Sequence, residues 1–220
     1  MPNFRIETHE DRERQLAEWK GYFPGARFGT LRDITRATYQ ELRRALEEGR
    51  EESIQNFLTA NPYVIQYAIP HSGHHGVWVF PKQMIKPSAK NGVAGLIPDY
   101  LVVSRSSLGF FWHVVELKRF DRQFANRKGD DLSIDGSRGV IQCQKYLSHF
   151  NDYIDAIRIN IQAPELVQPM GAILLIGDSE AESWQQNELR GNFEKSGSKI
   201  SIVSYRRLIY SLASDLRLKS

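Results

Sequence analysis

The chain has 220 residues, of which 41% are apolar and 25% are charged, and its formal net charge is +3. This length is sufficient for one compact domain that buries roughly 70% of its unfolded surface. The small net charge excludes a protein that holds nucleic acid through bulk positive charge. The sequence has no apolar run of membrane-spanning length, no signal-peptide pattern at its start, and a single cysteine, Cys143, which excludes an internal disulfide. We therefore expect a cytoplasmic protein without a membrane partner.

The first 48 residues predict an arm followed by a helix. Residues 1–30 mix charges, aromatic residues and Gly-Pro without a period, so we expect a partly ordered arm packed on the domain or on another subunit. From Leu31 to Glu48 apolar residues recur at helical spacing, and Gly49 should end that helix. The functional domain is expected to span residues 49–220.

A second helix begins near Glu51 and is stopped by Asn61-Pro62. At 100° per residue, Glu51 lies on the apolar side of this helix with Ile54 and Leu58. Glu52 falls nearly opposite. Glu51 is thus the better candidate for an acid that reaches a neighbouring site, and the alternative is a glutamate that merely interacts favourably with the helix dipole.

Two strands are predicted next, at Tyr63–Ile69 and Gly76–Phe80. The connection between them contains His71, His74 and His75, a spacing that could hold zinc. Structural zinc needs four defined ligands, however, and no cysteine lies nearby. An exposed turn is the preferred interpretation, with a phosphate or DNA contact as the other possibility.

The centre of the chain predicts an antiparallel hairpin. Its strands are Ile97–Val103 and Phe110–Lys118, which a short polar connection containing glycine separates. Pairing Val103 with Phe111 or Trp112 sets the register between the two strands.

This register brings charged residues together at the ends of both strands. Counting outward places Asp99 opposite Val115 or Glu116, roughly 5 to 8 Å away at Cβ. Because strand side chains alternate, Glu116 and Lys118 project from one face and Leu117 from the other. One face of the hairpin end is therefore ionic.

Such an ionic cluster predicts a site for Mg²⁺ or Mn²⁺. Carboxylates packed together in an apolar sheet repel each other and lose hydration unless a cation compensates them. Asp99 and Glu116 are the candidate metal ligands, and the backbone carbonyl of Leu117 is a further oxygen donor. Lys118 could position the attacking water or neutralise charge on a phosphate. The alternative is a Glu116–Lys118 ion pair, with Asp99 opening a turn after Pro98.

A basic run follows the hairpin and could track the phosphates of DNA, although a solvated loop is the alternative interpretation. The candidate DNA-binding residues of this run are Lys118, Arg119, Arg122, Arg127 and Lys128. The acidic, glycine-rich segment 129–139 then predicts a mobile loop over the site.

A long helix is predicted from about Gly139 to Ile159. Cys143 belongs to its apolar stripe, so packing explains this cysteine better than nucleophilic chemistry does. Gln142 and Tyr146 are four residues apart on the flank, where such a pair can present a polar edge to a neighbouring site. Tyr146 is a candidate DNA contact or, equally, a half-buried aromatic residue that holds the helix.

The remaining segments extend an α/β pattern. Met170–Gly177 predicts a strand covered on both faces, because its apolar run is continuous and short. Ala181–Glu194 predicts a helix, Lys199–Ser204 a strand, and Tyr205–Leu216 an amphipathic helix.

Several of these segments resemble known nuclease motifs. Pro98-Asp99 together with Glu116-Leu117-Lys118 resembles the motif of the PD-(D/E)xK nuclease superfamily. Glu51-Glu52-Ser53-Ile54-Gln55-Asn56-Phe57-Leu58 and Gln142-Cys143-Gln144-Lys145-Tyr146 are similar to two helices of the Shedu family of prokaryotic anti-phage proteins. The resemblance spans roughly residues 50–180, about the length of one catalytic domain.

The resemblance implies a restriction endonuclease-like core with the order αβββαβ, in which helices flank a central mixed sheet. It implies an Mg²⁺- or Mn²⁺-dependent endodeoxyribonuclease that hydrolyses phosphodiester bonds in anti-phage defence. The implied partners are phage or plasmid DNA and further copies of the chain in a dimer or tetramer, since cutting both strands usually needs two sites. Glu51 would be a third metal-binding acid, and Gln142 a catalytic residue that orients water or phosphate.

Two alternative classes of function stay open. The same fold could be a nucleic-acid-binding or oligomeric assembly module that does not cut DNA. Alternatively, the acids could be structural, in a protein-interaction module that presents its N-terminal arm.

Overall fold

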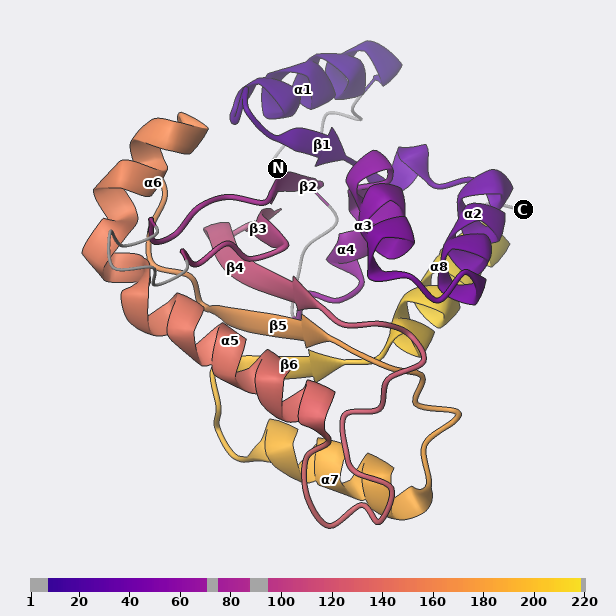
Figure 1. The fold of residues 1–220 in the computed structure, drawn as a ribbon. Helices are drawn as coiled ribbons and strands as arrows, with labels where there is room; N and C mark the ends of the chain where they lie inside the picture. The colour runs from indigo at the N-terminus through magenta and orange to yellow at the C-terminus, as the bar shows by residue number, and fades with distance from the viewer. Residues whose placement is uncertain (1–7, 71–74, 88–94, 219–220) are drawn as a thin grey trace, which may run out of the picture.

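The computed structural model describes residues 8–70, 75–87 and 95–218, so the predictions for His71 and His74 lie outside the described residues. Six strands form one sheet in the order β1 to β6 (Figure 1). The strands are β1 (Arg27–Gly29), β2 (Val77–Pro81), β3 (Tyr100–Ser106), β4 (Gly109–Leu117), β5 (Gly171–Leu175) and β6 (Ile200–Val203).

The sheet is mixed. Strands β1 to β4 pair antiparallel, whereas β4, β5 and β6 pair in parallel. Parallel neighbours need crossover connections, which here contain helices. The helices are α1 (His9–Gly21), α2 (Arg36–Glu47), α3 (Glu51–Ala60), α4 (Tyr63–Gln66), α5 (Ile134–Phe150), α6 (Ile154–Ile161), α7 (Trp184–Lys195) and α8 (Tyr205–Leu218), with 3₁₀ turns at Leu31–Asp33 and Asn151–Tyr153.

Helices cover both faces of the sheet (Figure 1). The α2, α3, α4 and α8 layer packs on one face, where Val79, Val102 and Val115 belong to its core. Helices α5 and α6 pack on the other face, against residues such as Trp112 and Leu174. Because both faces are covered, the central strands are continuous apolar runs. The predicted α/β class, with a mixed sheet flanked by helices, is confirmed.

The predicted hairpin is also confirmed. Val103 pairs with Trp112, one of the two predicted partners, and the ladder continues to Tyr100 opposite Val115. One further step places Asp99 at the level of Glu116.

The N-terminal arm is more ordered than predicted. Thr8 and Asp11 form a capping box that begins α1, and residues 27–29 pair with β2 as strand β1. Phe23 is buried between the rings of Trp78 and Trp112. Aromatic burial therefore ties this segment to the sheet, although its sequence has no helical period. The division at residue 48 stays a prediction.

The predicted strand at Tyr63–Ile69 is wrong, since Tyr63–Gln66 form the short helix α4. Pro62 precedes it in the helical region, with φ of −59° and ψ of −31°. All four residues of α4 are buried, and a short apolar run that is buried all round has no period by which to distinguish a helix from a strand.

The predicted mobile loop at 129–139 is partly wrong. Ser133 caps α5 by accepting a hydrogen bond from the backbone N–H of Gly136, so the helix begins at Ile134. The helix thus begins earlier than the predicted Gly139. It ends at Phe150 rather than at Ile159, and a 3₁₀ turn separates it from α6. The glycines of this segment serve close packing: a Cβ on Gly136 would lie 2.2 Å from the carbonyl oxygen of Phe124.

Across the described residues, no helix combines the length and the apolar character needed to cross a membrane.

Replacing Gly136 with alanine should destabilise the protein by about 1 to 3 kcal/mol, because the added methyl group collides with backbone rather than with a flexible side chain. Gly191→Ala in α7 is the matched control, since a Cβ there meets nothing within 4 Å. That change should be neutral or stabilising by up to about 1 kcal/mol. Urea unfolding followed by circular dichroism measures both, and equal effects would contradict the close packing of α5.

His113 should make stability depend on pH. Burial lowers the pKa of His113 to about 4, and its Nδ1 has no hydrogen-bond partner within the described residues. Below about pH 6.5, His113 therefore binds a proton in the unfolded chain but stays neutral in the folded protein until the pH falls to about 4. Between pH 7 and pH 5 the free energy of unfolding should fall by about 2 kcal/mol more in the wild type than in His113→Leu. Parallel pH dependences in urea unfolding would contradict this.

Candidate active site

The ends of β3 and β4 bring two buried carboxylates together. The backbone N–H of Leu117 donates to Asp99 Oδ2 at 2.6 Å, which joins the residue before β3 to the end of β4. Glu116 is the neighbour of Leu117, and the Asp99 and Glu116 side chains are only 4% and 5% exposed. The structure thus brings together the two acids that the hairpin register predicted.

Glu116 is held by partners on both of its carboxylate oxygens. Lys118 Nζ donates to Oε1 at 2.7 Å, which agrees with the prediction that these two side chains share a face. From α5, the Tyr146 hydroxyl donates to Oε2 at 2.9 Å. A carboxylate with both oxygens engaged keeps a fixed orientation.

Sequence reasoning missed Lys82, which pairs with Asp99. Lys82 Nζ donates to Asp99 Oδ1, and the backbone N–H of Lys82 donates to the Asp99 carbonyl at 2.9 Å. Pro81 in β2 pairs with Tyr100, so Lys82 lies across the sheet from Asp99. A lysine directly after a strand that neighbours the aspartate strand was the available signal, but the order of the strands was needed to use it.

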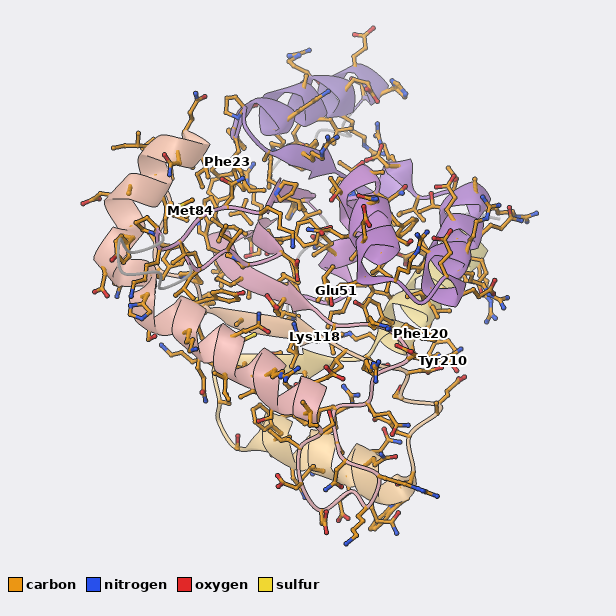
Figure 2. All side chains as sticks on the ribbon, in the orientation of Figure 1. Phe23, Glu51, Met84, Lys118, Phe120 and Tyr210 are labelled. Atoms are coloured by element: carbon orange, nitrogen blue, oxygen red, sulfur yellow. The ribbon has the colours of Figure 1, made fainter. Side chains whose placement is uncertain are left out.

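Glu51 approaches the same cluster from the opposite helical layer. It opens α3, is half-buried, and lies near Lys118 in Figure 2, whereas Glu52 is exposed. The Tyr100 hydroxyl donates to the Gln55 carbonyl at 2.6 Å, which fixes α3 on β3 directly after Asp99. The choice of Glu51 over Glu52 agrees with this placement.

The charged groups of the cluster shift one another's pKa values. Burial, followed by the charge of Asp99, raises the pKa of Glu116, and the same two causes raise the pKa of Glu51. Burial alone would lower the pKa of Lys118, but the carboxylates of Glu116, Glu51 and Asp99 raise it. Three acids, Asp99, Glu116 and Glu51, therefore share one region with the ammonium groups of Lys118 and Lys82.

Two predicted residues of α5 have different surroundings. Tyr146 is 3% exposed, so its ring is in the core, and its hydroxyl contacts Glu116 rather than a surface that DNA could reach. Gln142 lies one helical turn earlier and is half-buried, and its side chain forms no hydrogen bond within the described residues. Its role toward water or phosphate stays a prediction, as does that of the Leu117 carbonyl.

The basic run is only partly free to bind phosphate. Arg119 makes two hydrogen bonds to Asp121, at 2.9 and 2.6 Å, and Arg122 lies 3.7 Å from Asp135. Arg127 and Lys128 are exposed in the turn after Asn126. The loop is anchored to α7 by Gln186, whose amide donates to the Asn126 carbonyl at 2.8 Å.

The donor atoms suit a hard cation, although the acids are occupied by lysines. Within the described ranges, no three Asp, Glu, His or Cys side chains form a group that could hold a metal ion. Mg²⁺ commonly binds through one or two carboxylates and keeps several waters, so Asp99 and Glu116 suffice as the protein carboxylates. Carboxylate and carbonyl oxygens are the ligands that Mg²⁺ and Mn²⁺ prefer, so the candidate donor atoms favour these ions over zinc.

No model of a known protein family matches the sequence, and no curated protein matches it either.

Replacing Tyr146 with phenylalanine should destabilise the fold by about 1 to 3 kcal/mol at pH 7, because Glu116 loses a buried donor to a charged acceptor. Tyr153→Phe is the matched control, since the Tyr153 hydroxyl forms no hydrogen bond within the described residues. That control should change stability by less than about 0.5 kcal/mol. Urea unfolding compares the two variants, and an equally small effect of both would show that Tyr146 does not hold Glu116.

Proposed function

We propose that the chain is an Mg²⁺- or Mn²⁺-dependent endodeoxyribonuclease of the PD-(D/E)xK superfamily. The observation that carries the proposal is the burial of Asp99 and Glu116 side by side at the ends of two strands, with Lys118 on Glu116 and Glu51 approaching from α3. Keeping carboxylates together out of water is costly, and a binding site for a cation explains why the chain tolerates it.

The order of the elements supports the same proposal. From α3 the chain continues through β2, β3, β4, α5 and β5, which agrees with an αβββαβ core once the short helices α4 and α6 are set aside. The two sequence motifs that resemble the Shedu helices lie on α3 and α5, one on each side of the sheet. A role in anti-phage defence follows from that resemblance and belongs to the proposal.

The residues of the site can be assigned to steps of phosphodiester hydrolysis. Asp99, Glu116 and the Leu117 carbonyl would hold the ion, with Glu51 contributing directly or through water. When bound, the ion would polarise the phosphate and lower the pKa of a water molecule, so that hydroxide becomes available as the nucleophile. Lys118 would hold the attacking water or offset the charge that develops on the phosphate, because its ammonium group is desolvated and fixed by Glu116. Gln142 would orient the water or a phosphate oxygen.

DNA would approach the strand ends between the basic run and α3. Arg127 and Lys128 are exposed and could contact flanking phosphates directly. Arg119 and Arg122 would first have to leave their aspartates. Assembly into a dimer or tetramer would supply the second active site that cutting both strands requires.

The proposal is tested by incubating plasmid and linear DNA with the protein and Mg²⁺ or Mn²⁺. Glu116→Gln and Lys118→Ala should each lower the cleavage rate by at least about 100-fold, because the first removes a carboxylate that would hold the ion and the second removes the ammonium group that would hold the water or offset charge on the phosphate. Circular dichroism establishes that the variants are folded. Full activity of either folded variant would refute the mechanism.

A matched pair of variants tests the placement of α3. Glu51→Gln should lower the cleavage rate, because Glu51 is half-buried and lies close enough to Asp99 and Lys118 for their charges to shift its pKa. Glu52→Gln should leave the cleavage rate unchanged, because Glu52 is exposed. If DNA binding persists while no metal ion stimulates strand breakage in the wild type, the chain is instead a non-cleaving nucleic-acid-binding module.

A further inference from the structure

We propose that Lys82 is an internal substitute for the metal ion: it neutralises Asp99 in the metal-free protein and is displaced when a divalent cation binds. The proposal rests on the metal site of the proposed function and deepens it, because it identifies what the cation must compete with. The juxtaposition of the Lys82 ammonium group and the buried Asp99 carboxylate carries the inference.

The two lysines of the cluster differ in how easily they can leave. The Lys118 side chain is only 14% exposed, and its backbone carbonyl accepts a hydrogen bond from Tyr205 at 2.7 Å. The Lys82 side chain is 51% exposed, whereas its partner Asp99 is almost fully buried. A half-exposed ammonium group can leave its partner and become fully hydrated without rearranging buried neighbours, so Lys82 is the cation that a metal ion can replace.

The second observation is the backbone of Lys82. Its φ is +50°, in the left-handed region that glycine and asparagine occupy with far less strain. The strained residue is next to the candidate site, where its N–H donates to the Asp99 carbonyl. A lysine at a position that favours glycine or asparagine indicates that the side chain itself is required there.

The ion pair between Lys82 and Asp99 affects how tightly the site can bind a cation. With Lys82 in place, Asp99 and Glu116 each have one ammonium partner, whereas Glu51, the third acid of the cluster, forms no ion pair within the described residues. The metal-free cluster is therefore stable enough to fold, while each metal ion that binds must pay the cost of separating Asp99 from Lys82. Lys82 thus sets the cation concentration at which the site fills.

The experiment measures Mn²⁺ binding by isothermal titration calorimetry in the absence of DNA, so it does not depend on cleavage. Lys82→Asn removes the ammonium group and suits the left-handed backbone, and it should bind Mn²⁺ about threefold to tenfold more tightly than the wild type. Lys82→Arg keeps the charge and should bind no more tightly than the wild type. Lys86→Met is the control for losing one positive charge in the same segment and should match the wild type.

A second measurement detects the exchange itself. Selective NMR of the lysine ammonium groups should show a Lys82 signal protected by its bond to Asp99 in the metal-free protein. That protection should disappear when diamagnetic Mg²⁺ is added. Lys82→Asn identifies the signal.

The outcomes separate the two proposals. If all four proteins bind Mn²⁺ equally and the Lys82 signal is unchanged by Mg²⁺, the exchange is overturned while the metal site stands. If no protein binds Mn²⁺, the metal site of the proposed function is overturned and the exchange with it.

Discussion

The constraint on which the site depends is the register of the β3–β4 hairpin. Pairing Val103 with Trp112 carries Asp99 to the level of Glu116, and the Leu117 amide then closes on Asp99. A slip of one residue would move the acids to opposite faces of the sheet. Because both faces of these strands are buried under helices, such a slip would also exchange the apolar side chains that the two helical layers pack against.

The surrounding elements supply hydrogen-bond donors to the two carboxylates that this register buries. Two carboxylates removed from water need donors, and they receive them from three directions: Lys82 after β2, Lys118 after β4, and Tyr146 on α5. Each donor comes from an element whose position is set by apolar packing elsewhere. The polar cluster is therefore a product of the core.

Local patterns were sufficient where segment length, flanking turn residues or a helical period indicated a single conformation. The hairpin, the continuous apolar strand that became β5, and the amphipathic helix α8 were all predictable, since their burial patterns are simple. Reasoning from local pattern failed where burial came from distant partners. Segment 63–66 is apolar on every side, and α1 has no apolar face of its own, so only their tertiary packing decides their conformation.

By itself, the sequence determined the α/β class, the hairpin that brings Asp99 to the end of the Glu116 strand, and the shared face of Glu116 and Lys118, because these follow from periodicity and counting along two adjacent strands. It left Asp99 opposite either Val115 or Glu116, and the structure selected the register that places it at Glu116. The tertiary structure decided that Lys82 and Tyr146 complete the cluster and that Arg122 lies beside Asp135 of α5. The physical reason is that these contacts join elements far apart in the chain. Strand order and helix placement set them, and neither is encoded in any short stretch of sequence.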